Sequence, residues 1–198
     1  MSVTCVIPCK PYDQAKTRLA PCLTPRQRAE LSRLLLLRTV RLVCTLLDRV
    51  LVISRDRGLL EEVRAIGALP LAEERTGLNP ALRQAARLVS AAGAGGILVL
   101  PADLPLVTAQ DILDILRYAS TSPCVVIAPC RHGTGTNALL VQPPLLVPFA
   151  FGAGSFARHT AAARAAGVEP IVAKGSPTLA FDLDTPTDWR IVRAQFDL

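Results

Sequence analysis

The hydrophobic residues of the chain gather in short, mostly continuous runs, which Gly, Pro and charged residues interrupt. Short runs rich in β-branched residues and Leu are typical of strands that are buried on both faces of a sheet. The pattern predicts strands at Val3–Ile7, Val50–Ser54, Ala68–Leu71, Ile97–Leu100, Cys124–Ala128, Asn137–Val141, Val168–Ala173 and, as a short one, near Leu179–Phe181.

Helix signals lie between these strands. A capping residue followed by Pro is the pattern of a helix start, and Thr with an acid three residues later is typical of a capping box. Such starts occur at Thr24-Pro25, Asn79-Pro80, Thr108 with Asp111, and Thr185-Pro186. Glycine is the usual residue after a helix end, and here Gly67, Gly93 and Gly167 are expected to stop helices.

Strands that alternate with helices predict an α/β fold with a three-layer, mostly parallel sheet. The pattern has no internal repeat and no linker, so we expect a single domain over residues 1–198. In open sheets of this class, ligands bind at the carboxyl ends of the strands. Candidate binding and catalytic residues are therefore expected in the loops that follow the strands.

The composition supports a folded domain without a membrane span. Hydrophobic residues make up 51% of the 198 residues and charged residues 19%. The most apolar stretch, Leu31–Leu47, is interrupted by arginines and is shorter than the run of about 18–20 apolar residues that a membrane helix needs. The first strand begins almost at once, without a basic leader, so a cytoplasmic protein is expected. The apolar run Leu34–Leu37 leaves a homodimer interface as an option.

The net charge of +6 is compatible with nucleic acid or with small polyphosphates as partners. Arginines are scattered and only 4% of the residues are aromatic, which argues against nucleic-acid binding. The six cysteines form no C-x-x-C pair and no zinc pattern with the two histidines. Cys5, Cys44 and Cys124 lie in apolar segments and are expected to be buried.

A polar loop directly follows the first strand and carries Lys10, Lys16 and Arg18. The chain has only three lysines, and two of them lie here. Because an ammonium group is a compact charge that suits phosphate oxygens, the loop is a candidate triphosphate-binding segment. A solvated basic loop is the alternative. The loop lacks the glycines of a Walker P-loop or a dinucleotide fingerprint.

Three aspartates follow strands in positions suited to a metal. Asp103 stands between Pro101 and Pro105, just beyond an apolar strand, and Asp182 and Asp184 alternate in a later segment. Carboxylates that converge from two strand ends are oxygen ligands of the kind that Mg²⁺ binds. For Asp184 alone, a role at the start of the last helix is a strong alternative.

Two glycine-rich stretches are candidate anion sites, at 131–137 and 151–156. Glycines let backbone N–H groups approach an anion, and the second stretch leads into a helix whose N-terminus carries the Ser155 hydroxyl. Two anion sites beside a metal indicate an acceptor that is itself phosphorylated or carboxylated. Each stretch taken singly could be a plain turn.

Taken together, the motifs resemble the guanylyltransferases that begin assembly of the side chain of coenzyme F-420. The resemblance covers nearly the whole chain. It rests on six motifs in one order: Ile7–Ala20, Gly77–Leu82, Leu100–Leu106, Arg131–Leu140, Phe151–His159 and Asp182–Pro186.

The resemblance implies a nucleotidyltransferase fold like that of nucleotide-diphospho-sugar transferases, GTP as donor, Mg²⁺ as cofactor and a three-carbon phosphoacid as acceptor. It implies acceptor-binding roles for Thr136, Gly152 and Ser155, and a metal site at Asp103, Asp182 and Asp184. We further expect Lys10, Lys16 and Arg18 to bind the triphosphate and stabilise the leaving pyrophosphate, with Gly77 and Asn79 near the base or ribose.

The resemblance leaves the acceptor open. Phosphoenolpyruvate is favoured, and 2-phospho-L-lactate and 3-phosphoglycerate are the alternatives within the family. A molybdenum-cofactor-type guanylyltransferase is another alternative, and a non-catalytic nucleotide-binding module is the alternative of a different class. Cys130 and Cys9 depart from the family pattern, which usually has a polar residue, often Asp, and an aliphatic residue at these positions.

Overall fold

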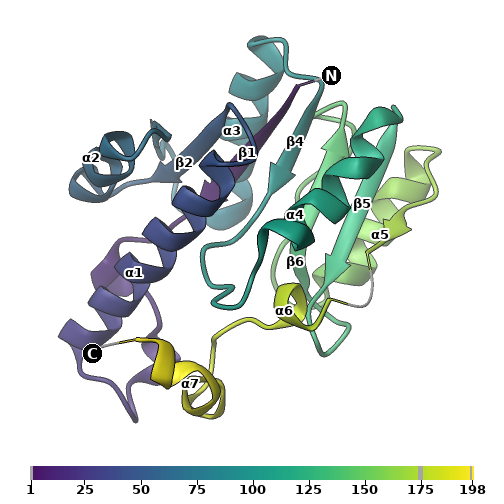
Figure 1. Cartoon of the computed structure of the whole chain (residues 1–198). Helices are drawn as coiled ribbons and strands as arrows, with labels where there is room; N and C mark the ends of the chain where they lie inside the picture. The colour runs from purple at the N-terminus through teal and green to yellow at the C-terminus, as the bar shows by residue number, and fades with distance from the viewer. Residues whose placement is uncertain (1, 174–175, 197) are drawn as a thin grey trace.

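In the computed structural model, which describes residues 2–173, 176–196 and 198, strands and helices alternate along one chain (Figure 1). One sheet has the strand order β3-β2-β1-β4-β6-β5-β7. Its strands are β1 (Val3–Pro8), β2 (Val50–Ser54), β3 (Leu69–Ala72), β4 (Gly96–Val99), β5 (Cys124–Pro129), β6 (Thr136–Gln142) and β7 (Ile171–Val172). Neighbouring strands are parallel except at β6, which runs antiparallel to β4 and β5.

The helices are α1 (Pro25–Cys44), α2 (Arg57–Ala65), α3 (Leu78–Ala91), α4 (Ala109–Leu116), α5 (Ser155–Ala165), α6 (Pro177–Ala180) and α7 (Pro186–Val192). Three of the predicted starts are confirmed as capping boxes, at Thr24, Thr108 and Thr185. The predicted stop glycines are also confirmed, because Gly67, Gly93 and Gly167 follow helices with φ of 94°, 73° and 76°.

The pleat of the strands divides the core between the two faces of the sheet. On β1, Cys5 and Ile7 face one apolar cluster together with residues of α1, α2 and α4. Val6 points the other way, into a cluster that includes α3 and α5. Figure 1 shows these helices on opposite sides of the sheet. The predicted three-layer architecture is therefore confirmed.

The strand order places a switch point between β1 and β4. The chain moves outward through β2 and β3, and then returns to add β4 on the other side of β1. Loops that leave β1 and β4 in opposite directions form the crevice where α/β sheets bind ligands. Because β6 is antiparallel, its first residue, Thr136, lies at the same edge as the carboxyl end of β5.

Three predicted elements differ from the structure. The strand expected over Val168–Ala173 is shorter, since β7 covers only Ile171–Val172. The strand expected near Leu179–Phe181 is wrong, because Leu179 lies in the short helix α6. The Ser176 hydroxyl accepts a hydrogen bond from the Leu179 N–H at 3.0 Å, and Pro177 occupies the first helical position, so the local capping signal outweighs the apolar pattern. The start expected at Asn79-Pro80 is two residues late, since Gly77 is the N-cap of α3.

The leucine run in α1 packs inside the protein. Leu35, Leu36 and Leu37 are at most 6% exposed, so most of the run is used by the core and leaves little surface for an interface. Within the described residues, no helix combines the length and hydropathy needed to cross a bilayer. All six cysteines are free thiols; Cys5 and Cys124 are buried as expected, whereas Cys44 is only partly buried.

Candidate active site

The loop after β1 forms two short 3-10 turns, η1 (Tyr12–Gln14) and η2 (Thr17–Leu19). Lys16 lies between them with φ of 53°, and it is the one non-glycine residue with a left-handed backbone in the part of the chain that the structure describes. This conformation costs an L-residue about 1–2 kcal/mol. It accompanies a Lys16 side chain that is only 9% exposed, whereas the Arg18 side chain is 76% exposed.

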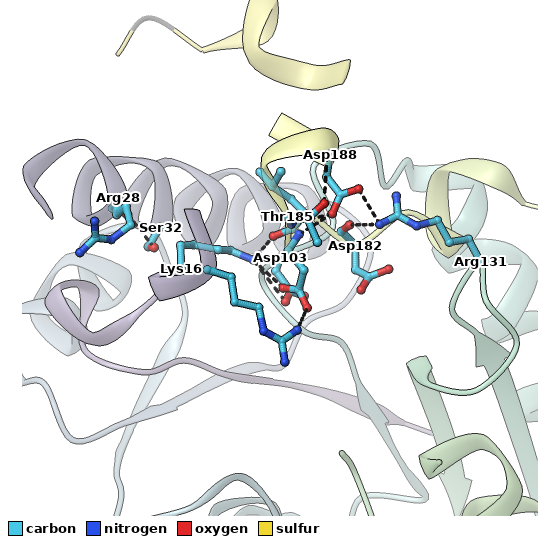
Figure 2. A network of polar contacts seen from close by, with 11 residues as sticks. Lys16, Arg28, Ser32, Asp103, Arg131, Asp182, Thr185 and Asp188 are labelled. Carbon is cyan, nitrogen blue, oxygen red and sulfur yellow. Dashed lines mark hydrogen bonds and ion pairs between the residues drawn. The ribbon is translucent and has the colours of Figure 1, made fainter. Parts of the chain in front are cut away.

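The Lys16 ammonium group lies between two carboxylates (Figure 2). Its Nζ is 3.4 Å from Asp103 Oδ2 and 3.7 Å from Asp184 Oδ1, and it donates to the Leu183 carbonyl oxygen at 2.6 Å. Arg18 Nη1 reaches the other oxygen of Asp184 at 3.2 Å. The structure therefore brings together two of the three predicted basic residues and two of the three predicted acids.

A backbone contact joins the two acidic segments. The Leu183 N–H donates to the Asp103 carbonyl oxygen at 3.0 Å. Phe181 and Leu183 are buried in an apolar cluster beside α1 and α7, while Asp182 and Asp184 between and after them are partly exposed. The alternation predicted for this segment is confirmed, and it holds both acids on the side away from the core.

The acids crowd one another electrostatically. Burial raises the pKa of the Asp184 carboxyl, and the negative charge of Asp103 raises it further, as does that of Asp182. Lys16 and Arg18 lower it but do not cancel the increase. A site with surplus negative charge of this kind favours an added cation.

The donor atoms fit Mg²⁺. Asp182 Oδ1 is buried and has no hydrogen-bond partner among the described residues. Within the same residues, no three His, Cys, Asp or Glu side chains are arranged to hold a metal by themselves. That is no obstacle, because Mg²⁺ commonly takes one or two carboxylates and completes its shell with water and substrate phosphates. The metal set of Asp103, Asp182 and Asp184 stays a prediction.

Asp188 and Arg131 form a brace behind Asp184 that was not predicted from the sequence. Asp188 in α7 accepts hydrogen bonds from the backbone N–H groups of Asp184 at 3.0 Å and Thr185 at 2.7 Å. Its other oxygen accepts from Arg131 Nη2 at 2.7 Å, and the same guanidinium group lies 3.3 Å from the Asp182 carbonyl oxygen. Figure 2 shows Arg131 entering from the side opposite Lys16. Asp188, not Asp184, is the capping partner of the last helix.

The two glycine-rich stretches meet beside this cluster. The Phe156 N–H donates to the Thr134 carbonyl oxygen at 3.1 Å, which joins the β5–β6 loop to the start of α5. Thr136 and Ser155 are 7% and 2% exposed, and Gly152 is exposed with φ of 114°, where a side chain would be strained. The predicted acceptor-binding residues thus lie on two joined segments, although their role is a prediction.

Consecutive residues of α5 hold this loop, and neither was singled out from the sequence. Arg158 donates to the Ala150 carbonyl oxygen through Nε at 3.1 Å and Nη2 at 2.8 Å. His159 accepts from the Ala150 N–H at 3.0 Å, and its other nitrogen lies 3.0 Å from Thr136 Oγ1. Both residues belong to the Phe151–His159 motif. Nothing in the motif distinguishes them from their neighbours in α5, and only their contacts in the structure show that they hold the loop.

The residues predicted to bind the nucleotide make other contacts. Both ends of the Asn79 amide are used by the backbone of Phe151, which donates to Oδ1 at 2.8 Å and accepts from Nδ2 at 3.1 Å. The Gly77 N–H donates to the Glu73 carboxylate at 2.8 Å. Lys10 is exposed and has no ion pair among the described residues. Asn79 therefore joins the start of α3 to the glycine-rich segment that precedes α5.

Cys130 has a local role at the base of the β5–β6 loop. Its sulfur accepts from the Gly135 N–H at 3.1 Å, and a Cβ on Gly135 would lie 3.1 Å from that sulfur. The departure from the family pattern thus keeps a hydrogen-bond acceptor at this position.

Comparison with known proteins decides the family. The model of a family described as "Guanylyl transferase CofC like" matches residues 3–192. The chain belongs to this guanylyl transferase family. It is therefore a guanylyltransferase, as the order of its motifs predicted.

Curated relatives agree over most of their length. A phosphoenolpyruvate guanylyltransferase of Rubrobacter xylanophilus is 47% identical over 95% of this chain and 92% of its own. A 2-phospho-L-lactate guanylyltransferase of Methanothermobacter thermautotrophicus is 36% identical over 95% of this chain and 82% of its own.

Solved structures show the same fold at low identity. A protein provisionally assigned as a nucleotide-diphospho-sugar transferase, from Desulfovibrio desulfuricans G20, superposes with a TM-score of 0.78 at 16% identity, over 97% of this chain and 87% of that chain. A 4-diphosphocytidyl-2C-methyl-D-erythritol synthase gives a TM-score of 0.65 at 16% identity, over 99% of both chains. The predicted nucleotidyltransferase fold is confirmed.

Proposed function

We propose that this protein transfers GMP from GTP to the phosphate of phosphoenolpyruvate and releases pyrophosphate, as an early step of coenzyme F-420 biosynthesis. The observation that carries the proposal is the position of Lys16 between Asp103 and Asp184 at the switch point of the sheet. The Lys16 ammonium group is held between two carboxylates and lies beside a loop with a buried hydroxyl. A site of this kind suits a reaction between two phosphates.

The chemistry needs no general base. A phosphate monoester dianion is already a nucleophile, and one of its oxygens attacks the α-phosphorus of GTP. The bond from the α-phosphorus to the oxygen that bridges it to the β-phosphorus breaks, and that oxygen leaves with pyrophosphate. The product is a guanosine diphosphate ester of the three-carbon acid. His159, which is fully buried behind Thr136, is not needed to move a proton.

The basic loop would stabilise the charge that develops on the leaving group. Lys16 is rigidly held, whereas the exposed Arg18 and Lys10 can turn toward a triphosphate. Positive groups fixed where charge develops are worth more than mobile ones, because they need no reorganisation in the transition state. Bound at Asp103 and Asp184, with Asp182 adjacent, Mg²⁺ would neutralise phosphate charge and orient the two phosphates.

Phosphoenolpyruvate is the proposed acceptor because the Rubrobacter relative is named for it at 47% identity. The more distant Methanothermobacter relative is named for 2-phospho-L-lactate, so that acid is the second candidate. Both acids present one carboxylate and one phosphate, which Thr136, Ser155 and the backbone N–H groups of the Gly152 loop can receive.

The test incubates the protein with GTP, Mg²⁺ and each of phosphoenolpyruvate, 2-phospho-L-lactate and 3-phosphoglycerate, and follows pyrophosphate release and product mass. We expect most product from phosphoenolpyruvate, little from CTP in place of GTP, and none after chelation of Mg²⁺. Because such diphosphate esters are labile, the next enzyme of the pathway is added as a trap in a parallel reaction. Absence of pyrophosphate with every acid would favour a non-catalytic nucleotide-binding module.

A further inference from the structure

His159 is a buried imidazole that the proposed chemistry leaves unused. It projects from α5, is 0% exposed, and packs against the ring of Phe151 at a centroid distance of 4.8 Å. Both of its nitrogens have partners: Nε2 lies 3.0 Å from the Ala150 backbone nitrogen, and Nδ1 lies 3.0 Å from Thr136 Oγ1. A histidine that served only to fill space in the core would not need a polar partner at each ring nitrogen.

These two contacts fix the tautomer of the ring. A backbone N–H can only donate, so Nε2 must accept from Ala150 and carry no hydrogen. Burial lowers the pKa of His159 to about 4, with a smaller contribution from the positive charge of Arg158, so the ring is neutral near pH 7. A neutral imidazole has one N–H, which is therefore on Nδ1 and donates to Thr136 Oγ1.

The tautomer in turn sets the direction of the Thr136 hydroxyl. Because Oγ1 accepts from His159, the hydrogen of the hydroxyl must point to a different partner. Among the described residues, Thr136 Oγ1 has no other hydrogen-bond partner. The hydroxyl is left as a donor at the sheet edge where the two glycine-rich stretches meet, and the acceptor's phosphate and carboxylate groups can only accept.

We propose that His159 is a positioning residue that holds the Thr136 hydroxyl as a hydrogen-bond donor toward the anionic acceptor. The backbone of Ala150 anchors the arrangement, since its carbonyl oxygen accepts from Arg158 while its N–H donates to the ring. The inference deepens the proposed function and rests on it, because it assigns to Thr136 a ligand that the proposed reaction supplies.

Two substitutions separate the contacts of the ring. In His159→Gln the amide reaches the position of Nε2 and can accept from Ala150, but the donor at Nδ1 is lost. In His159→Asn the amide reaches the position of Nδ1 and can donate to Thr136. We expect the KM for the phosphoacid to rise by about 10-fold or more in the Gln variant, since a bond to a charged group is weakened. The Asn variant should recover most of that loss, and the KM for GTP should stay within about 2-fold in both.

A double-mutant comparison distinguishes positioning from packing. Thr136→Val removes the hydroxyl through which His159 is proposed to act, so adding His159→Gln to Thr136→Val should not raise the acceptor KM further. An equal rise in both backgrounds, with circular dichroism and melting temperature unchanged, would overturn the proposal. No rise in either background would overturn it as well.

The tautomer can be measured without any turnover. The chain has only two histidines, and His132 is exposed. In a His132→Gln variant, long-range proton–nitrogen NMR of the remaining ring should show hydrogen on Nδ1 between about pH 6 and 8. Hydrogen on Nε2 would overturn the proposal. If the wild type transfers GMP to none of the acids, the proposed function fails. The NMR measurement still tests the tautomer of His159 in that case, because it does not depend on turnover.

Discussion

The candidate active site has two halves that are built differently. At the ends of β1 and β4, Lys16, Asp103 and Asp184 are held by ion pairs, and the two acids keep side-chain exposures of 37%. At the start of β6 and α5, Thr136 and His159 are buried and joined by a hydrogen bond between neutral groups. We refer to these as the charged half and the neutral half.

The difference matches two different tasks. Charge that develops on phosphates is stabilised best by full charges, and the surplus negative charge of the charged half leaves room for an added cation. An acceptor that must be oriented is better served by donors whose direction is fixed, and neutral buried groups keep that direction over a wide pH range. The charged half should therefore govern turnover and the neutral half acceptor affinity.

The largest effect is expected from Asp103→Asn. Loss of one of the two acids that flank Lys16 should lower kcat by about 100-fold or more while leaving the fold intact. The measurement is steady-state pyrophosphate release, with circular dichroism to check folding. Asp114→Asn is a matched control, because Asp114 is a half-exposed acid of α4 paired with Arg117. Unchanged turnover in Asp103→Asn would remove the metal-site assignment.

Thr136→Val should raise the KM for the acceptor by about 10- to 100-fold with little change in the KM for GTP, because one hydrogen bond to a charged group is lost. Thr39→Val is the isosteric control. Thr39 is 1% exposed in α1, and its hydroxyl has no partner among the described residues, so its replacement should leave both KM values unchanged. A parallel rise for GTP would show that the two halves do not act separately.

Asp188→Asn should have an effect of intermediate size on stability and kcat, because it disrupts the brace that Asp188 and Arg131 form behind Asp184. It weakens the contacts to Arg131 and to the backbone of Asp184, which should cost about 1–3 kcal/mol of stability and several-fold in kcat. A cycle with Arg131→Gln measures the coupling. Additive losses in the double variant would mean that the pair is not a unit.

The pH dependence of the brace follows from the same contacts. Burial alone would raise the pKa of Asp188, but hydrogen bonds from the Asp184 and Thr185 N–H groups, with the charge of Arg131, bring the net pKa below its usual value. A carboxyl with a depressed folded pKa stabilises the protein above its unfolded pKa and loses that contribution as the pH falls through the folded value. The wild type should therefore be more stable than Asp188→Asn at neutral pH, and this difference in stability should disappear as the pH falls. Thermal melts at a series of pH values can measure it.

The smallest expected effect is a gain in stability from Asp184→Asn. The raised pKa of Asp184 means that the folded state binds a proton more tightly than the unfolded state, so ionisation lowers stability as the pH rises above the ordinary value of 3.8. Without ligands, the variant should melt a few degrees above the wild type at about pH 7 and alike at about pH 3. A lower melting temperature at neutral pH would show that the pairs with Lys16 and Arg18 outweigh the crowding.

Local signals in the sequence were enough for the framework of the fold. The helix starts at Thr24, Thr108 and Thr185 depend on residues within three positions, so they are predicted from the sequence and confirmed; the capping box was predicted at Thr108 alone, and the structure shows one at each. The error at Leu179 also has a local cause. The apolar pattern there favours a strand, whereas the cap at Ser176 and the proline after it favour a helix, and the structure has the helix. The antiparallel direction of β6 depends on pairing with β4, which no local pattern expresses.

The sequence by itself determined the family, the three-layer sheet, and the gathering of basic, acidic and glycine-rich motifs at the ends of strands. Only the tertiary structure decided which of these residues touch. Lys16 contacts Asp103 across 87 positions and the Leu183 carbonyl oxygen across 167, and His159 lies within hydrogen-bond distance of both Thr136 Oγ1 and the Ala150 backbone nitrogen. Such contacts depend on the distances between side chains and on their burial in the folded chain. A sequence motif shows which residues are present, but it shows neither their distances nor their burial.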